Sequence, residues 1–320
     1  MSFFQSQKGL PLSLRSSPNF PAALYLVILA SLFLNLQVKA QAQSAGRAVT
    51  LAVLDFGDST LGRVSAEKLG ANLKHETDIV VLDHDQTQAA ARGAGYTNSM
   101  NLTLSEARDL GAALGCDFFI LGDAQTLRRS PSTGPLYFES YASIFVVSSR
   151  TGRLVDWDRQ DFRAPTAVAA EQSLSAELSA FDIRNRSAVS IRRAQADERR
   201  ERAFTSNEGD QQTPVIKVAP DDDKRAEAEG IRLPRPYRHL LPAYPETASR
   251  AETEATVDVL VDLDAGGEVM RVSVARWAGF GLDEATIDTV RKLHFFPAMR
   301  NGVAIPIRVL LRYNFRKPPR

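Results

Sequence analysis

The sequence predicts an α+β protein with two folded segments, joined by a helical stretch and a disordered linker. Near the N-terminus, VTLAVLDFG is a mostly continuous apolar run, as in strands buried on both faces, and helical stripes follow it. Near the C-terminus, ATVDVLVDLD alternates apolar and polar residues, as in a sheet with one covered face. Between the two lies a polar stretch with Pro214 and Pro220 that has little apolar surface to bury.

The first segment, residues 48–164, is expected to be a mixed α/β sheet domain. Strands are predicted in VTLAVLDFG, DIVVLDHD and CDFFILGDAQTL, with helices in LGRVSAEKLGANLKHE and TLSEARDLGAALG between them. LYFESYASIFVVSSRTGRLVDWDRQDF adds two strands joined at a turn that carries Gly152. The order β-α-β-α-β-β-β indicates a sheet with both parallel and antiparallel pairs.

The middle of the chain is expected to be helical and then unstructured. Residues 165–204 predict a helical extension, with Leu174, Leu178 and Phe181 in a short apolar stripe that gives way to charge on all sides. Residues 205–231 predict a flexible linker.

The last segment, residues 232–316, is expected to fold as β-β-α-β. Its final strand runs to Phe315 and has an apolar face and a mixed face. Ile305, Ile307, Val309, Leu311, Tyr313 and Phe315 share the apolar face, and Arg308, Leu310, Arg312 and Asn314 share the other. Pro306 favours a position at a sheet edge or a strand start, because proline cannot donate a ladder hydrogen bond. No later strand follows to cover this one, so the edge is expected to be open to pairing.

The N-terminal residues 1–42 predict an export signal. Lys8 and Arg15 precede an apolar run from Pro21 to Leu36, and the small residues of Ala40-Gln41-Ala42 follow. The segment is either a signal peptide cleaved after Ala40 or Ala42, or an uncleaved signal anchor. Both place the rest of the chain beyond the inner membrane, and the single cysteine fits a bacterial periplasm better than a disulfide-rich secreted module.

The composition excludes several classes of function. Lys and Arg total 39 against 38 for Asp and Glu, so no global basic field indicates nucleic acid. The four histidines are scattered and predict no metal site. No phosphate-binding loop and no set of nucleophile, base and orienting group can be assembled, so we expect no catalytic residues, no cofactor and no enzyme activity.

Residues 232–315 closely resemble the TonB C-terminal domain family. The resemblance rests on PAYPETA, the hairpin VDVLVDLDAGGEV, GLDEATIDTVRKLHFFPA and NGVAIPIRVLLRYNF, in order and at suitable spacing. One departure is RAETEATVDV, where the family usually has a glycine before the first strand. The structural residues that carry the motif are Tyr244, Pro245, Leu282, Ala285, Phe296, Pro297, Asn301 and Gly302.

The resemblance implies a partner for the final strand. In the family this strand pairs with an extended peptide, the TonB box, of outer-membrane TonB-dependent receptors, and so supports energy-dependent transport across the outer membrane. The implied docking residues are Ile305, Ile307, Arg308, Val309, Leu310, Leu311, Arg312, Tyr313 and Phe315. The alternative is that the strand pairs only within the domain or in a homodimer, in an envelope scaffold or assembly factor.

Two further comparisons concern the rest of the chain. Residues 48–180 resemble the N-terminal domain of TolB and CsgG-like envelope domains through VTLAVLDFGD, LSEARDLGAALGCDFFILGDAQ and VVSSRTGRLVDW. TonB proteins engage an ExbB/ExbD-type motor through a Ser and a His one turn apart in a membrane helix. Here Ser31 is followed by Asn35, and no histidine lies in the apolar run. The Ser and His pair is therefore missing, and an ExbB/ExbD-type motor is expected as a partner only if the N-terminal segment is retained as an anchor.

Overall fold

The computed structural model describes residues 48–207, 217–219 and 223–317. These residues belong to one compact unit, Ala48–Arg320. The predicted signal peptide or anchor, residues 1–42, lies outside the described residues. Among the helices of the described part, none combines the length and the apolar character that crossing a bilayer requires.

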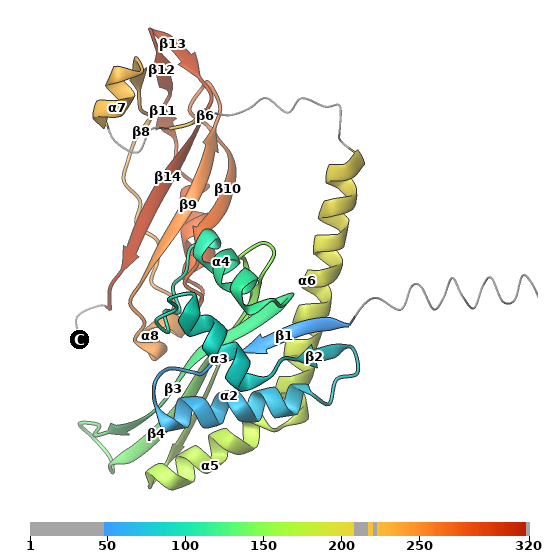
Figure 1. Cartoon of the computed structure of the whole chain (residues 1–320). Coiled ribbons are helices and arrows are strands. Elements are labelled where there is room, and N and C mark those ends of the chain that lie inside the picture. Colours follow the sequence, from blue (N-terminus) through green and yellow to red (C-terminus); the bar gives the residue numbers. More distant parts are fainter. Residues whose placement is uncertain (1–47, 208–216, 220–222, 318–320) are drawn as a thin grey trace, which may run out of the picture. The chain divides into compact units, whose positions relative to one another are not determined.

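The first sheet is mixed and has the strand order β2-β1-β3-β4-β5 (Figure 1). β1 pairs in parallel with β2 and β3, whereas β3, β4 and β5 pair antiparallel. The strands are β1 (Val49–Val53), β2 (Ile79–Val81), β3 (Phe118–Arg129), β4 (Tyr137–Ser148) and β5 (Leu154–Ala164). The predicted combination of parallel and antiparallel pairs is therefore present.

Helices cover both faces of this sheet. On one face, apolar side chains of three helices meet the sheet: α2 (Thr60–Leu73), α5 (Ala167–Leu178) and α6 (Phe181–Asn207). On the other face lie α3 (His84–Gly93) and α4 (Leu104–Leu114). A capping box of Thr103 and Glu106 begins α4, and Gly115 ends it in the left-handed conformation.

The second sheet has the order β10-β9-β14-β6. β9 (Ala255–Leu263) pairs antiparallel with β10 (Val269–Arg276) and with β14 (Ile307–Phe315), and β6 (Lys217–Val218) pairs in parallel with the start of β14. Two smaller sheets accompany it. One pairs β11 (Phe295–Phe296) with β8 (Arg235–Pro236). In the other, β12 (Ala298–Arg300) lies between β13 (Val303–Ile305) and β7 (Ile231–Arg232). The helices are α7 (Asp223–Ala228), α8 (Glu246–Ala251) and α9 (Leu282–Val290).

The predicted final strand is divided at Pro306. Ile305 belongs to β13, and the uninterrupted strand begins at Ile307. Before it, Asn301 and Gly302 both have positive φ, 50° and 85°, which turns the chain into the hairpin of β12 and β13. The predicted linker, residues 205–231, contains the end of α6 and the short elements β6, α7 and β7.

One apolar core takes residues from both sheets. Phe119, Leu121 and Phe145 of the first sheet belong to the same buried cluster as Val257 and Val259 of the second. The two predicted segments thus contribute to one buried cluster, and their division into separate domains stays a prediction.

Candidate functional site

The outer edge of β14 is the feature that the sequence resemblance indicates as a docking site. The Ala219 amide donates to the Arg308 carbonyl at 2.7 Å, so the backbone groups of Arg308 point away from β9. Backbone groups alternate along a strand, so those of Leu310, Arg312 and Asn314 point the same way. β6 pairs only with Ile307 and Arg308, and no other described strand pairs with this side of β14. Three consecutive outward ladder positions are thus open.

The side chains of β14 divide between two faces as the alternation predicts. Ile307, Val309 and Phe315 are buried in the core, and Leu310 on the opposite face is 52% exposed. The remaining docking residues of the apolar face, Leu311 and Tyr313, are half-buried. The apolar pattern of this strand is therefore used internally, and the outward edge offers mainly backbone groups.

The two arginines of β14 are engaged by aspartates of β9. Arg308 contacts Asp262 through Nε at 2.5 Å and Nη2 at 2.9 Å, and Arg312 contacts Asp258 at 2.7 and 3.0 Å. The hydrogen bond from Arg308 holds the pKa of Asp262 below its usual value. Burial by itself would raise the pKa of Asp258, but Arg312 and then Arg276 hold it low. Both arginines thus fix the strand to its neighbour rather than projecting as free charges.

The edge of β5 in the first sheet differs sharply from that of β14. Asp156 accepts the amide of Trp157, and Asp158 accepts the amide of Arg159, each at 2.9 Å. These carboxylates occupy amides that an added strand would need. Native sheets commonly protect exposed edges with charged side chains.

The other two edges are short or covered at their ends. β2 has three residues. β10 is bridged at one end by Arg276 and Thr103, and Glu268 and His294 form a second bridge just beyond its other end. The outer side of β14 therefore differs from these edges in offering three outward positions in a row, Leu310, Arg312 and Asn314, that no described strand pairs.

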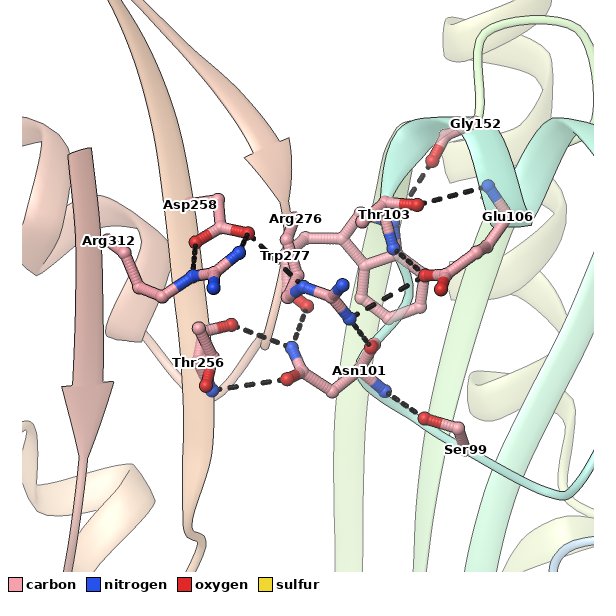
Figure 2. A network of polar contacts seen from close by, with 10 residues as sticks. All are labelled: Ser99, Asn101, Thr103, Glu106, Gly152, Thr256, Asp258, Arg276, Trp277 and Arg312. Atoms are coloured by element: carbon pink, nitrogen blue, oxygen red, sulfur yellow. Dashed lines mark hydrogen bonds and ion pairs between the residues drawn. The ribbon is translucent and has the colours of Figure 1, made fainter. Parts of the chain in front are cut away.

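A second notable region joins the two segments. Trp277, 1% exposed, follows β10, and its Nε1 donates to the Gly152 carbonyl at 3.0 Å (Figure 2). Its ring stacks on Phe145 with centroids 5.9 Å apart, and Phe280 contacts Phe145 edge-on at 5.5 Å. A Cβ on Gly279 would lie 2.5 Å from the Phe145 ring, so the loop approaches β4 as closely as a residue without a side chain allows.

Asn101 makes a polar contact beside these rings. Its Nδ2 donates to the carbonyls of Thr256 and Trp277 at 2.8 and 2.6 Å, and its Oδ1 accepts the Thr256 amide at 3.1 Å. One side chain thus satisfies three backbone groups of the other segment.

A chain of charges links this contact to β14, as Figure 2 shows. Asp258 is 3% exposed and lies between Arg312 and Arg276, whose Nε is 3.3 Å away. Arg276 Nη1 in turn donates to the Asn101 carbonyl at 2.8 Å and lies 3.6 Å from Glu106. The polar face of the second sheet is therefore connected to the N-terminus of α4.

The motif residues of the predicted C-terminal domain have structural positions. Tyr244 donates to the Thr253 carbonyl at 2.5 Å and packs near Phe315. Pro245 precedes α8, and Leu282 begins α9 and is fully buried. Of the other motif residues, Ala285 lies in α9, Phe296 is exposed beside Tyr237, Pro297 follows β11, and Asn301 and Gly302 form the hairpin turn.

The sequence pattern did not predict the residues that join the segments. Trp277 and Phe280 lie in the loop WAGFG, which has neither helical nor strand periodicity. Two large aromatic side chains in a glycine-rich loop are a signal of burial, although the surface that receives them cannot be read from the sequence.

Comparison with known proteins defines the class of the last segment. Residues 241–316 match the family model described as the Gram-negative bacterial TonB protein C-terminal. The chain therefore contains a TonB C-terminal domain.

Two relatives carry the TonB name. The protein named TonB in two strains of Xanthomonas campestris pv. campestris is 39% identical over 75 residues, which is 23% of this chain and 34% of that protein. This chain thus spans about a third of the length of the curated relatives it matches.

Several solved structures are also similar. The TonB C-terminal domain of Pseudomonas aeruginosa is 22% identical, covering 27% of this chain and 89% of that one, with a TM-score of 0.24. The LpoB C-terminal domain of Salmonella enterica is 14% identical, covering 36% and 83%, with a TM-score of 0.27. The comparisons lend no support to the TolB- or CsgG-like assignment of residues 48–180.

Proposed function

We propose that this protein is a TonB-family component of the cell envelope that binds outer-membrane receptor peptides by strand addition to β14. The observation that carries the proposal is the row of outward backbone groups at Leu310, Arg312 and Asn314, which no described strand pairs. The partners would be TonB-dependent receptors carrying a TonB box, and the result would be support for energy-dependent transport across the outer membrane.

The energetics of strand addition suit this edge. Each backbone hydrogen bond contributes about 0.5–1.5 kcal/mol net, and three outward residues offer a donor and an acceptor each. Arg308 and Arg312 form ion pairs with β9 and so help to hold β14 in the sheet, which reduces the ordering of the edge that binding would require. The edge of β5 is less suited to the peptide, because Asp156 and Asp158 already accept the amides of Trp157 and Arg159.

The test is a pair of substitutions at Leu310 in the full chain. Leu310→Pro removes an outward amide and should weaken binding of TonB-box peptides by about 1–3 kcal/mol, since a peptide carbonyl is left unpaired. Leu310→Ala removes the side chain but keeps the amide and serves as the matched control. Isothermal titration that finds equal affinity for the two variants, or no binding of any TonB-box peptide to the parent protein, would contradict the proposal.

A second candidate is an envelope scaffold or assembly factor in which the TonB-like domain is only a binding or dimerisation module. The specific observation in its favour is the core shared between the two segments, with Trp277 and Phe280 in contact with Phe145. The likeness of residues 48–180 to TolB and CsgG-like domains belongs to this hypothesis. A homodimer that the Leu310→Pro change dissociates, with no binding of receptor peptides, would favour it.

Export and anchoring remain separate questions. We infer a periplasmic location from the N-terminal sequence and from the TonB similarity, with an ExbB/ExbD-type motor as a partner only if the N-terminus is retained. N-terminal sequencing of the protein from cells tests this: a mature chain that begins after Ala40 or Ala42 supports cleavage, and one that begins near Met1 and fractionates with the inner membrane supports an anchor.

A further inference from the structure

The segment that follows α6 returns to the edge of β14. Lys217 pairs with Ile307 and Val218 with Arg308, in parallel, and the Ala219 amide donates to the Arg308 carbonyl at 2.7 Å. Figure 1 shows β6 beside the second sheet, although many residues separate it from β14 in the sequence. This chain thus already adds a strand of its own to the edge on which the proposed function depends.

β6 and an incoming peptide would need the same ladder position. The Arg308 carbonyl is the first of the outward groups on β14, and the Ala219 amide occupies it. A peptide that paired along the whole edge, from Arg308 to Asn314, would therefore have to displace Ala219. A shorter peptide would be limited to Leu310, Arg312 and Asn314.

The contact is small enough to be displaced. It consists of two residue pairs, Val218 is 58% exposed, and Ala219 is half-buried against the core. The sequence also limits its extent, because Pro220 follows directly and has no amide to continue the ladder, while it biases Ala219 toward the extended conformation. Because β6 and β14 belong to the same chain, their pairing is intramolecular and does not depend on the protein concentration.

We propose that β6 is an internal competitor for the docking edge, so that residues 217–219 lower the affinity of β14 for extended peptides until a peptide displaces them. The proposal rests on the proposed function in one respect only, which is that the external peptide is a TonB box. The apparent affinity of a site that is partly occupied in cis falls by the fraction of molecules in which the site is open.

The test compares two prolines in the full chain. Ala219→Pro removes the amide that donates to Arg308. Val218→Pro is the matched control, because alternation turns the amide of Val218 away from β14. TonB-box peptides should bind Ala219→Pro about two- to ten-fold more tightly than the parent, the range expected for one lost backbone hydrogen bond, and Val218→Pro should bind like the parent.

Amide hydrogen exchange provides a second readout on the parent protein. The Ala219 amide should be protected, and the Leu310 and Arg312 amides should exchange rapidly. Addition of the peptide should reverse this order. Equal peptide affinity for all three proteins, or an Ala219 amide that stays protected in the bound state, would overturn the proposal.

A different outcome separates this inference from the proposed function. If TonB-box peptides bind none of the three proteins, the proposed function fails, and a synthetic peptide of residues 213–220, TPVIKVAP, decides the inference. That peptide should bind Ala219→Pro more tightly than the other two proteins, because in this variant β6 no longer occupies the edge of β14 with which the peptide would pair. Identical behaviour of the three proteins toward it would refute the role of β6.

Discussion

Replacement of Trp277 tests whether the two segments fold as one unit. The ring is 1% exposed and contacts Phe145 of the first sheet, so Trp277→Ala should lower the free energy of unfolding by about 3–5 kcal/mol. Trp277→Phe keeps most of the ring and loses the hydrogen bond to Gly152, which should cost about 1–3 kcal/mol because a carbonyl is left without its donor. Small domains are stable by only about 5–15 kcal/mol, so the alanine variant should be severely weakened.

Urea unfolding followed by circular dichroism measures the free energy of unfolding that each variant loses. Amide exchange shows which strands lose protection. If the core is shared, Trp277→Ala should increase exchange in β3 and β4 as well as in β9 and β14. Proteolytic nicking between Phe204 and Gly230 should leave parent fragments together on gel filtration and should let the alanine fragments separate. Loss of protection confined to residues 255–315 would refute the shared core and favour the independent folding that the sequence predicts.

Three further predictions concern groups near this contact. Asp283 is 7% exposed and burial raises its pKa to about 6, despite two backbone hydrogen bonds, so its contribution to stability should fall by about 3 kcal/mol as pH rises from about 3 to about 7. Urea unfolding at a series of pH values should show that slope, and an unchanged slope in Asp283→Asn would disprove its origin. Asp258→Ala should destabilise the protein by about 1–3 kcal/mol and Arg312→Ala by less than about 1, since only the aspartate is buried; thermal unfolding that reverses this order would contradict the role of Asp258. Gly279→Val should cost at least about 2 kcal/mol because it combines positive φ with a clash against Phe145, and a melting temperature equal to the parent's would show that the loop can move away.

Much of the second sheet could be predicted because its pattern repeats with period two. Val257, Val259, Val261 and Leu263 are all buried, as one covered face requires. The division of the last strand at Pro306 was harder to predict from the sequence. Proline allows either a strand start or an edge position, and only the backbone conformation of the preceding turn distinguishes them.

Other elements carry weaker signals. α3 was missed because HDQTQAAARG has no apolar stripe, although Asp83 caps its start and alanine favours the helix. The role of β14 as an edge strand was expected from the family resemblance of residues 232–315. The blocked edge of β5 could not, because Asp156 and Asp158 also fit an ordinary exposed strand, and their contacts with neighbouring amides depend on side-chain rotamers.

The unequal protection of the strand edges limits how copies of this chain could associate. Growth of a fibre by sheet extension needs two adhesive borders on each molecule, so that every new subunit presents a fresh one. Here Asp156 and Asp158 occupy amides at the edge of β5, whereas β14 offers an edge with open positions. Two molecules that paired through β14 would use this edge in both copies, so the same contact could not add a third copy.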